Sequence, residues 1–283
     1  MKMNAFRIMT YPYIAWITAM IVIPMILILF YAFTIEGNDV VSIKFSLENF
    51  TRFVTDTTFL RVVGKSLWIA FLTTIISIIM GYPVAYIISK ARGNHGIILI
   101  LLLTLPTWIN MLVRTYAWMG ILQKGGMLSK LLAFLGFPGV SLLYTDFAVT
   151  LGMVYNFLPF MILQIHTSLA KMDNSLLEAA ADLGASPRKS FLRVTLPYSL
   201  PGVLEGVTMV FVPAVTTFVI SQLMGGGKVP LIGDIIQNQF GKSSDWHFGA
   251  TLSLLVMVVV LAFMGGLNRI DKEEELQKEV RIL

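Results

Sequence analysis

The sequence has 283 residues, of which 56% are hydrophobic and only 13% are charged, and its net charge is +5. A soluble domain typically has about 45–50% apolar and about 25% charged residues, so this composition argues against a soluble fold and predicts a membrane protein. The sequence contains no cysteine, which excludes disulfides, cysteine metal sites and thiol catalysis. No basic patch is interleaved with aromatic residues, which argues against nucleic-acid binding.

Six segments are long and apolar enough to cross a membrane, since a crossing helix needs about 20 such residues. They lie near Pro12–Thr34, Ser66–Ser89, Ile97–Leu122, Phe147–Ser168, Leu200–Leu223 and Phe248–Asn268. The first has an apolar core that runs to Phe33 and no cleavage site follows it, so we expect a retained helix. The pattern predicts an all-α polytopic membrane protein with six transmembrane helices.

The distribution of basic residues predicts the orientation of these helices. Twelve Lys and Arg residues lie in the two termini and in the second-to-third and fourth-to-fifth loops, against eight in the other three loops. Because basic loops stay on the cytoplasmic side, both termini and the loop 171–201 are expected in the cytoplasm. The segment Ile35–Lys65 is expected outside.

Helix-bending residues recur in the predicted spans. Five spans contain one proline each, and the sixth contains Gly265–Gly266. The five prolines are Pro24, Pro83, Pro106, Pro159 and Pro213. Proline removes a helical hydrogen bond, which membrane helices tolerate when neighbours replace it. The pattern fits ordinary irregularity of membrane helices, and it equally fits bent helices around a path that opens and closes.

Polar residues in the outer half of the third span are the first candidates for a translocation path. The stretch "PTWINMLVRTYAW" carries Trp108, Asn110, Arg114 and Tyr116. These residues could form an interfacial anchor with an aromatic belt. Alternatively they face a path, because helical spacing predicts a common face for Thr107, Asn110 and Arg114.

Further path candidates lie in the fourth and fifth spans, where polar groups are costly and tend to be functional. Tyr155 and Asn156 precede Pro159, and Asn156 could either bind a carbonyl freed by that proline or line the path. Glu205 lies about one turn into the fifth span. Its carboxylate could reach the interface or contact substrate.

Catalytic and metal sites are not predicted. Three scattered histidines and no acidic cluster argue against a metal. The stretch Met224–Pro230, "MGGGKVP", lacks the first glycine and the final Ser or Thr of a nucleotide loop. Without a nucleophile–base pair or a cofactor motif, the chain is expected to be non-catalytic.

The loop 171–201 contains signals for a short helix. Ser175 and Glu178 have the spacing of a capping box, which predicts a helix over Leu176–Leu183. Gly184 is suited to the left-handed position that ends a helix. An isolated eight-residue helix is only marginally stable unless it packs on another surface. The segment could therefore be a helix that docks on a partner or a solvated turn between two spans.

A second helix start follows in the same loop. Ser186 is expected to cap it, with Pro187 at its first position. Pro197 is expected to end it. The first helix would present an apolar face of Leu176, Leu177, Ala180 and Leu183.

The loop also carries the pattern E-A-A-x3-G-x9-I-x-L-P, with Val194 in place of the isoleucine. This pattern resembles the signature of permease subunits of binding-protein-dependent ABC importers. The resemblance implies the type I importer permease fold and a coupling helix that fits a groove on the ATPase subunit. It assigns ATPase coupling to Leu176, Leu177, Glu178, Ala179, Ala180, Asp182, Gly184, Ala185, Leu196 and Pro197. The family's shared core would cover residues 62–268, with a peripheral helix in 1–61 and a tail in 269–283.

Other stretches are similar to the first permease of spermidine/putrescine importers. They are "GYPVAY", "LPTWINMLVRTYAW", "LEAAADLGAS", "LMGGGKVPLIGDIIQNQF" and "DWHFGA". The resemblance implies a second homologous permease, an ATPase dimer and an extracytoplasmic substrate-binding protein in the bacterial cytoplasmic membrane. Ile232, Ile235, Ile236 and Phe240 form a helical apolar stripe that could receive the binding protein.

One feature conflicts with a polyamine path. Such a path should show carboxylates, yet the clearest charge within a predicted span is Arg114. Three explanations stay open: Arg114 is paired or outside the path, the partner permease supplies the acids, or the substrate is not a polycation. Alternatives are therefore a permease of the same fold for iron, sulfate or another anion, and a stand-alone secondary transporter or channel.

Overall fold

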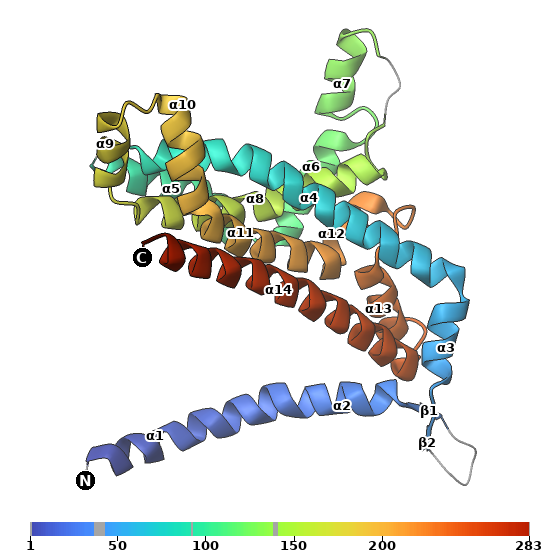
Figure 1. The fold of residues 1–283 in the computed structure, drawn as a ribbon. Coiled ribbons are helices and arrows are strands. Elements are labelled where there is room, and N and C mark those ends of the chain that lie inside the picture. The colour runs from blue at the N-terminus through green and yellow to red at the C-terminus, as the bar shows by residue number, and fades with distance from the viewer. Residues whose placement is uncertain (1, 37–42, 92, 138–140, 283) are drawn as a thin grey trace. The chain divides into compact units, whose positions relative to one another are not determined.

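The computed structural model describes residues 2–36, 43–91, 93–137 and 141–282 (Figure 1). Within these ranges, five helices are long and apolar enough to cross a membrane. They are Thr10–Ala32, Thr57–Ser89, Asp146–Ala170, Pro187–Thr216 and Trp246–Leu267. A sixth crossing exists if the bent pair His95–Trp108 and Met111–Phe134 counts as one span. The predicted all-α polytopic fold is confirmed.

The chain forms two compact units, Met1–Arg61 with Ile235–Leu261, and Val62–Asp234 with Ala262–Leu283. The first unit begins with helical segments α1 (Lys2–Ile17), η1 (Thr18–Val22) and α2 (Ile23–Ala32), followed by β1 (Thr34–Glu36), β2 (Ile43–Phe45) and α3 (Glu48–Thr55). The strands pair antiparallel, with Thr34 opposite Phe45. The core of this unit consists of Ala32, Ala250 and Leu254 with surrounding aromatic residues.

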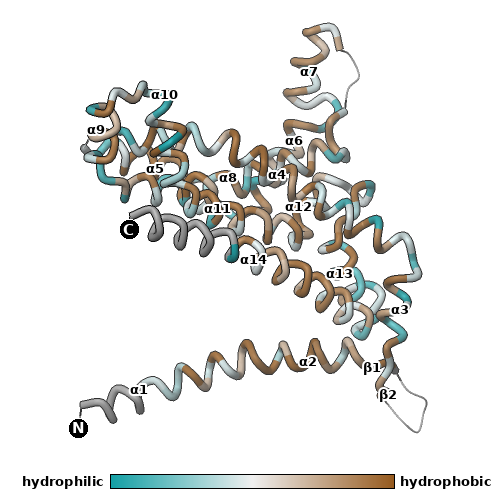
Figure 2. Tube along the Cα trace, in the orientation of Figure 1, coloured by the Kyte–Doolittle hydropathy of each residue, from teal (hydrophilic) through white to brown (hydrophobic). Residues whose placement is uncertain are grey.

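The second unit holds most of the remaining helices. They are α4 (Thr57–Ser89), α5 (His95–Thr104), η2 (Leu105–Trp108), α6 (Met111–Leu122), α7 (Met127–Phe134), α8 (Asp146–Ala170), α9 (Ser175–Asp182), α10 (Pro187–Ser190), η3 (Phe191–Thr195), α11 (Leu196–Thr216) and α12 (Val219–Gly225). The first turn of α4, Thr57–Arg61, belongs to the first unit, and the last two helices, α13 (Ile232–Gly241) and α14 (Trp246–Ile282), also contribute to both units. Figure 2 shows apolar residues along the spanning helices and hydrophilic ones around α9 and α10.

The centre of the second unit is α8, where 61% of the most apolar window is buried. Met153, Met161 and Ile165 on this helix are fully buried. Its closest neighbour is α11, because Gly202 lacks a side chain where the two helices cross. A Cβ at Gly202 would lie 2.5 Å from the Cβ of Ser168 and 2.7 Å from the carbonyl oxygen of Gln164. The pair α8–α11 therefore forms the closely packed centre of this unit.

The third predicted span is broken into two helices, so the prediction of one continuous helix over Ile97–Leu122 was wrong. The chain turns by 88° where Ile109 and Asn110 adopt extended backbone angles, with ψ of 138° and 133°. The side chain of Asn110 accepts a hydrogen bond from the amide of Leu112 at 2.8 Å and so begins α6. Thr107 and Asn110 consequently lie on different helices, and the predicted common face with Arg114 is also wrong.

The fifth predicted span, Leu200–Leu223, differs at both ends. The helix begins at Pro187 and ends at Thr216, and Thr217 is extended (ψ 140°) before α12 begins. The second span begins at Thr57, nine residues before the predicted Ser66. The first, fourth and sixth spans agree with their predicted bounds to within two residues.

Pro197 does not end the helix as predicted, because a π-helical turn accommodates it. The amide of Leu196 binds the carbonyl of Phe191, five residues back, at the end of η3. This wider turn gives the proline ring room beside the preceding carbonyl groups. The same arrangement precedes Pro24, where the amide of Ile23 binds the carbonyl of Thr18. The loop 171–201 therefore runs into α11 without a break.

Candidate coupling and translocation sites

The candidate coupling helix α9 spans Ser175–Asp182, one residue earlier at each end than predicted. The chain leaves it through a Schellman motif, in which the amide of Ala185 binds the carbonyl of Ala180 at 3.0 Å and that of Gly184 binds Ala181 at 2.8 Å. Gly184 has φ +73°, which confirms its predicted left-handed conformation. A residue with a Cβ would be strained there.

The predicted capping box is wrong. Asn174, not Ser175, is the residue before the helix, and its side chain makes no capping bond. The carboxylate of Asp173 instead accepts a hydrogen bond from the amide of Ser175 at 2.9 Å, and this bond lowers the pKa of Asp173. The second helix start is at the predicted place, with Ser186 before Pro187, although the Ser186 side chain makes no capping bond.

The coupling candidates on α9 have little packing against the rest of the chain. No residue of α9 is buried, and Leu176 and Leu183 are 43% and 88% exposed. Glu178, Ala179, Asp182 and Gly184 are exposed, and Leu177, Ala180 and Ala185 are half-buried. In the following helix Leu196 is half-buried and Pro197 exposed. This short helix thus presents apolar and acidic side chains with no partner surface in the described part of the chain.

The two ends of the loop are fastened to spanning helices. The hydroxyl of Tyr198 donates to the carbonyl of Lys171 at 3.0 Å, which closes the base of the loop. The hydroxyls of Tyr82 and Ser199 lie 2.8 Å apart and join α4 to α11. The ring of Phe191 packs edge-on against the ring of Tyr82 at 5.9 Å and that of Tyr86 at 5.5 Å.

These contacts were missed from sequence, although "GYPVAY" places two tyrosines four residues apart at the end of a span. That spacing puts Tyr82 and Tyr86 on one helix face, which was the available signal. Together the contacts link α9 mechanically to α4, α8 and α11.

The seven path candidates do not gather in one place. Trp108 on η2 and Tyr116 on α6 are 77% and 57% exposed. Arg114 is half-buried, and its Nε has no hydrogen-bond partner among the described residues. Glu205 is exposed on α11. None of these four lines the cavity described below.

Asn156 is 2% exposed, and its Nδ2 donates to the carbonyl of Gly152 at 2.8 Å. Pro159 would free the carbonyl of Tyr155 instead, because a helical amide binds four residues back. The interpretation that Asn156 satisfies the freed carbonyl is therefore wrong. Its Oδ1 has no partner among the described residues.

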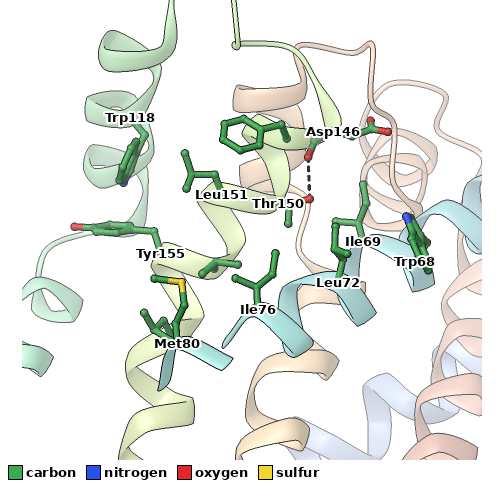
Figure 3. Close-up of a pocket in the computed structure, with 13 residues that line it drawn as sticks. Trp68, Ile69, Leu72, Ile76, Met80, Trp118, Asp146, Thr150, Leu151 and Tyr155 are labelled. Carbon is green, nitrogen blue, oxygen red and sulfur yellow. Dashed lines mark hydrogen bonds between the residues drawn. The ribbon is translucent and has the colours of Figure 1, made fainter. Parts of the chain in front are cut away.

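An apolar cavity of about 610 Å³ lies between α4, α6 and α8 (Figure 3). Its aromatic lining includes Trp68, Trp118 and Tyr155, and the rings of the last two meet edge-on at 5.3 Å. Asp146 lies at its edge, where its carboxylate pairs with the ammonium of Lys65 at 2.8 Å. Tyr155 is thus the one path candidate that lines this cavity.

The stretch before α13 is buried, contrary to the predicted receiving stripe. Leu231 and Ile232 are 0% and 1% exposed, so Ile232 cannot contribute to a surface. The amide of Ile232 donates to the hydroxyl of Ser66 on α4 at 2.8 Å. Ile235, Ile236 and Phe240 are half-buried in the first unit.

No family model matches the sequence. The chain is 36% identical over 255 residues to the spermidine/putrescine transport system permease protein PotB of Haemophilus influenzae, covering 88% of this chain and 89% of that protein. Its fold matches a crystal structure of a bacterial ABC transporter involved in alginate import, with a TM-score of 0.80, 16% identity and 95% of each chain covered. A bacterial alginate ABC transporter in complex with an alginate-bound periplasmic protein matches with a TM-score of 0.79, at 15% identity over 95% and 94% of the two chains.

The polytopic helical fold and the relationship to this permease define a permease subunit of an ABC importer. More narrowly, the chain belongs to the family of spermidine/putrescine transport system permease proteins. It is a multi-pass membrane protein.

Proposed function

We propose that this chain forms half of the translocation path of an ATP-driven importer for polyamines. The similarity to a spermidine/putrescine permease over 88% of the chain supports this substrate class. The single structural observation that carries the transport function is α9, a short helix without buried residues, in a loop whose base is fastened to α4, α8 and α11.

In this proposal α9 docks into a groove on a cytoplasmic ATPase. Leu183, 88% exposed, supplies apolar contact area, and Glu178 and Asp182 orient the approach by their charge. Docking supplies the packing that an isolated eight-residue helix lacks. The partner hydrolyses ATP, and this chain is non-catalytic and needs no cofactor of its own.

The remaining partners are a second homologous permease and an extracytoplasmic substrate-binding protein. A structural neighbour solved with a periplasmic protein supports the latter kind of partner. The bias of basic residues supports cytoplasmic termini in a bacterial cytoplasmic membrane. We keep the division into a peripheral segment 1–61, a permease core 62–268 and a tail 269–283.

The mechanism follows from how the loop is fastened. Closure of the ATPase dimer moves α9, and the motion passes through the continuous helix α10–η3–α11. The Tyr82–Ser199 and Tyr198–Lys171 hydrogen bonds carry it to α4 and α8. Opposite motions of these helices expose the path first to one side and then to the other.

Transport by the reconstituted complex tests the substrate class. Proteoliposomes that contain both permeases and the ATPase, with the binding protein outside, should take up putrescine and spermidine and hydrolyse ATP faster in their presence. Uptake of sulfate or ferric iron without polyamine uptake would overturn the proposal.

A second candidate substrate is an anion, because the Nε of Arg114 has no partner among the described residues. A cationic side chain of this kind suits an anionic solute. The uptake measurement above separates the two candidates directly. Stimulation of ATP hydrolysis by an anion alone would favour this second candidate.

Charge reversal on α9 tests the docking. Glu178→Arg should lower polyamine uptake at least about tenfold, since a docked carboxylate replaced by a cation meets like charge. Glu48→Arg is the matched control, because Glu48 is also exposed and in the first turn of a helix. Equal uptake by both variants would show that α9 is not the docking element.

A further inference from the structure

A buried carboxyl group lies outside the spanning helices, at the start of α13. Asp234 is 5% exposed, and its Oδ2 accepts a hydrogen bond from the amide of Leu231 at 2.8 Å. Its Oδ1 has no partner among the described residues. A buried acceptor without a partner is costly, so such an atom calls for an explanation.

No cation of the described chain pairs with this carboxyl group. The ion pairs within the described ranges are Arg52–Asp245 and Lys65–Asp146. Burial raises the pKa of Asp234, against the lowering effect of its bond to the Leu231 amide and of the nearby Ser221 hydroxyl, which itself donates to the carbonyl of Phe218 at 3.0 Å. An arriving cation beside this carboxyl group would favour its charged form.

The surroundings of Asp234 are rich in oxygen atoms. Gly233 lies so close to the end of α11 that a Cβ there would stand 2.5 Å from the carbonyl oxygen of Thr216 and 2.8 Å from that of Thr217. The C-terminus of a helix carries partial negative charge. The buried Ser221 of α12 adds a hydroxyl group beside the carboxyl group.

A primary ammonium group fits this set of atoms better than a metal ion does. It has three N–H donors and needs three acceptors, which a carboxylate, a hydroxyl and a carbonyl can supply. No group of three or more His, Cys, Asp or Glu side chains that could hold a metal occurs among the described residues. One carboxylate with neutral oxygens balances one unit charge.

We propose that Asp234 binds an ammonium group of the transported polyamine beside the break between α11 and α12. The inference rests on the proposed function, and it assigns to the path a buried carboxylate, which the exposed Glu205 of the fifth span does not provide. The chain breaks at Thr217 between α11 and α12, and substrate sites of transporters commonly lie at such discontinuous helices.

Neutralising the carboxylate tests the proposal in the reconstituted full complex. Asp234→Asn keeps an oxygen for the amide of Leu231 and removes the charge. Uptake of putrescine and spermidine should fall about tenfold or more, as expected when a charge-assisted hydrogen bond is lost. Asp56→Asn is the matched control, since this carboxylate also accepts a hydrogen bond from a backbone amide, that of Thr58 at 2.8 Å, and lies outside the spanning helices and the cavity. Equal uptake by the two variants would overturn the assignment.

A second measurement uses the wild-type complex and does not depend on transport. Dicyclohexylcarbodiimide modifies protonated carboxyl groups in apolar surroundings, and the modified peptide is quantified by mass spectrometry. Putrescine should protect Asp234 from modification, and 1,4-butanediol, its uncharged analogue, should not. Equal modification in both solutions would overturn the assignment even if Asp234→Asn failed to assemble.

The two measurements also separate this inference from the proposed function. A wild-type complex that takes up no polyamine refutes the proposed function, whereas the protection assay still decides whether Asp234 binds an ammonium group. Polyamine uptake without protection refutes the Asp234 assignment alone.

Discussion

The two ends of α8 offer a comparison, because each adjoins an eight-residue helix, α7 before it and α9 after it. Both helices end in a Schellman motif whose glycine has positive φ, +94° at Gly136 and +73° at Gly184. Both expose a large apolar side chain, Phe134 and Leu183, each 88% exposed. The local sequence thus forms two similar short helices, each with a glycine cap and an exposed apolar side chain near its end.

The difference lies in what each helix is attached to. The chain leaves α9 through Gly184 into a continuous helix that ends at Thr216, and hydrogen bonds from Tyr82 and Tyr198 fasten its base. The described contacts of α7 are mainly with α6, from which it projects (Figure 1). The difference shows that a short capped helix can transmit motion only if it is connected to the spanning helices. Because α7 has a similar cap without these connections, it is an internal control for α9.

The largest expected effect comes from replacing the two glycines with proline. Proline fixes φ near −65°, so Gly184→Pro and Gly136→Pro should both disrupt their turns. Uptake should fall more than about tenfold for Gly184→Pro and less than about twofold for Gly136→Pro, since only the former breaks the connection from α9 to α11. Uptake by proteoliposomes and thermal unfolding of each purified complex are the measurements.

The unfolding measurement separates strain from coupling. Proline cannot adopt positive φ and lacks the amide hydrogen that Gly136 and Gly184 each donate, so the two variants should lose similar stability. Similar uptake by both variants would show that the connection through Gly184 does not carry the motion.

A smaller effect is expected from shortening the two exposed apolar tips. Leu183→Ala should weaken ATPase binding by about tenfold, because a buried leucine contributes about 1.5–3 kcal/mol. Phe134→Ala should leave binding unchanged. Titration of the labelled ATPase onto the purified permease pair measures both. Weaker binding by Phe134→Ala would place the docking surface on α7 instead.

The smallest expected effect concerns how α9 begins. Asp173→Ala should loosen the first turn of α9, whereas Ser175→Ala should not, because the carboxylate of Asp173 holds the Ser175 amide. The pKa of Asp173 lies below its ordinary value of 3.8, so its stabilising effect is present above that value and is lost as pH falls through the lowered pKa.

Hydrogen exchange of peptides from the loop measures this effect. Near neutral pH the amides at the start of α9 should exchange faster in Asp173→Ala than in the wild type, and the difference should fade as Asp173 becomes protonated. If Ser175→Ala accelerated the exchange of these amides equally, the predicted capping box of Ser175 and Glu178 would be supported instead.

Much of the fold was predictable from sequence, because hydropathy identifies the segments that are apolar enough to lie in a membrane. Gly184 was predictable for a similar reason, since the demand for positive φ is local. The break at Ile109 was not, because the apolar run continues across it and hydropathy does not record a change of direction. The prediction that Pro197 ends the helix failed because the π turn before it accommodates the proline ring, and no local rule predicts such a turn.

The candidate sites divide in the same way. The coupling residues share one short stretch and one motif, so a sequence reveals them together. Asp234 depends on packing between distant segments, such as the hydrogen bond from Ile232 to Ser66, 166 residues away. Its neighbours in sequence, "VPLIGDIIQ", read equally well as an exposed amphipathic helix.

The π turn η3 sets the direction in which α9 points. Each residue of an α-helix turns the chain by about 100°, and a π turn holds one residue more than an α turn. If the same residues Phe191–Thr195 instead formed a regular α-helix, everything before them would be rotated by about that angle. The extra residue in the π turn therefore determines the side of the helix axis from which α9 projects.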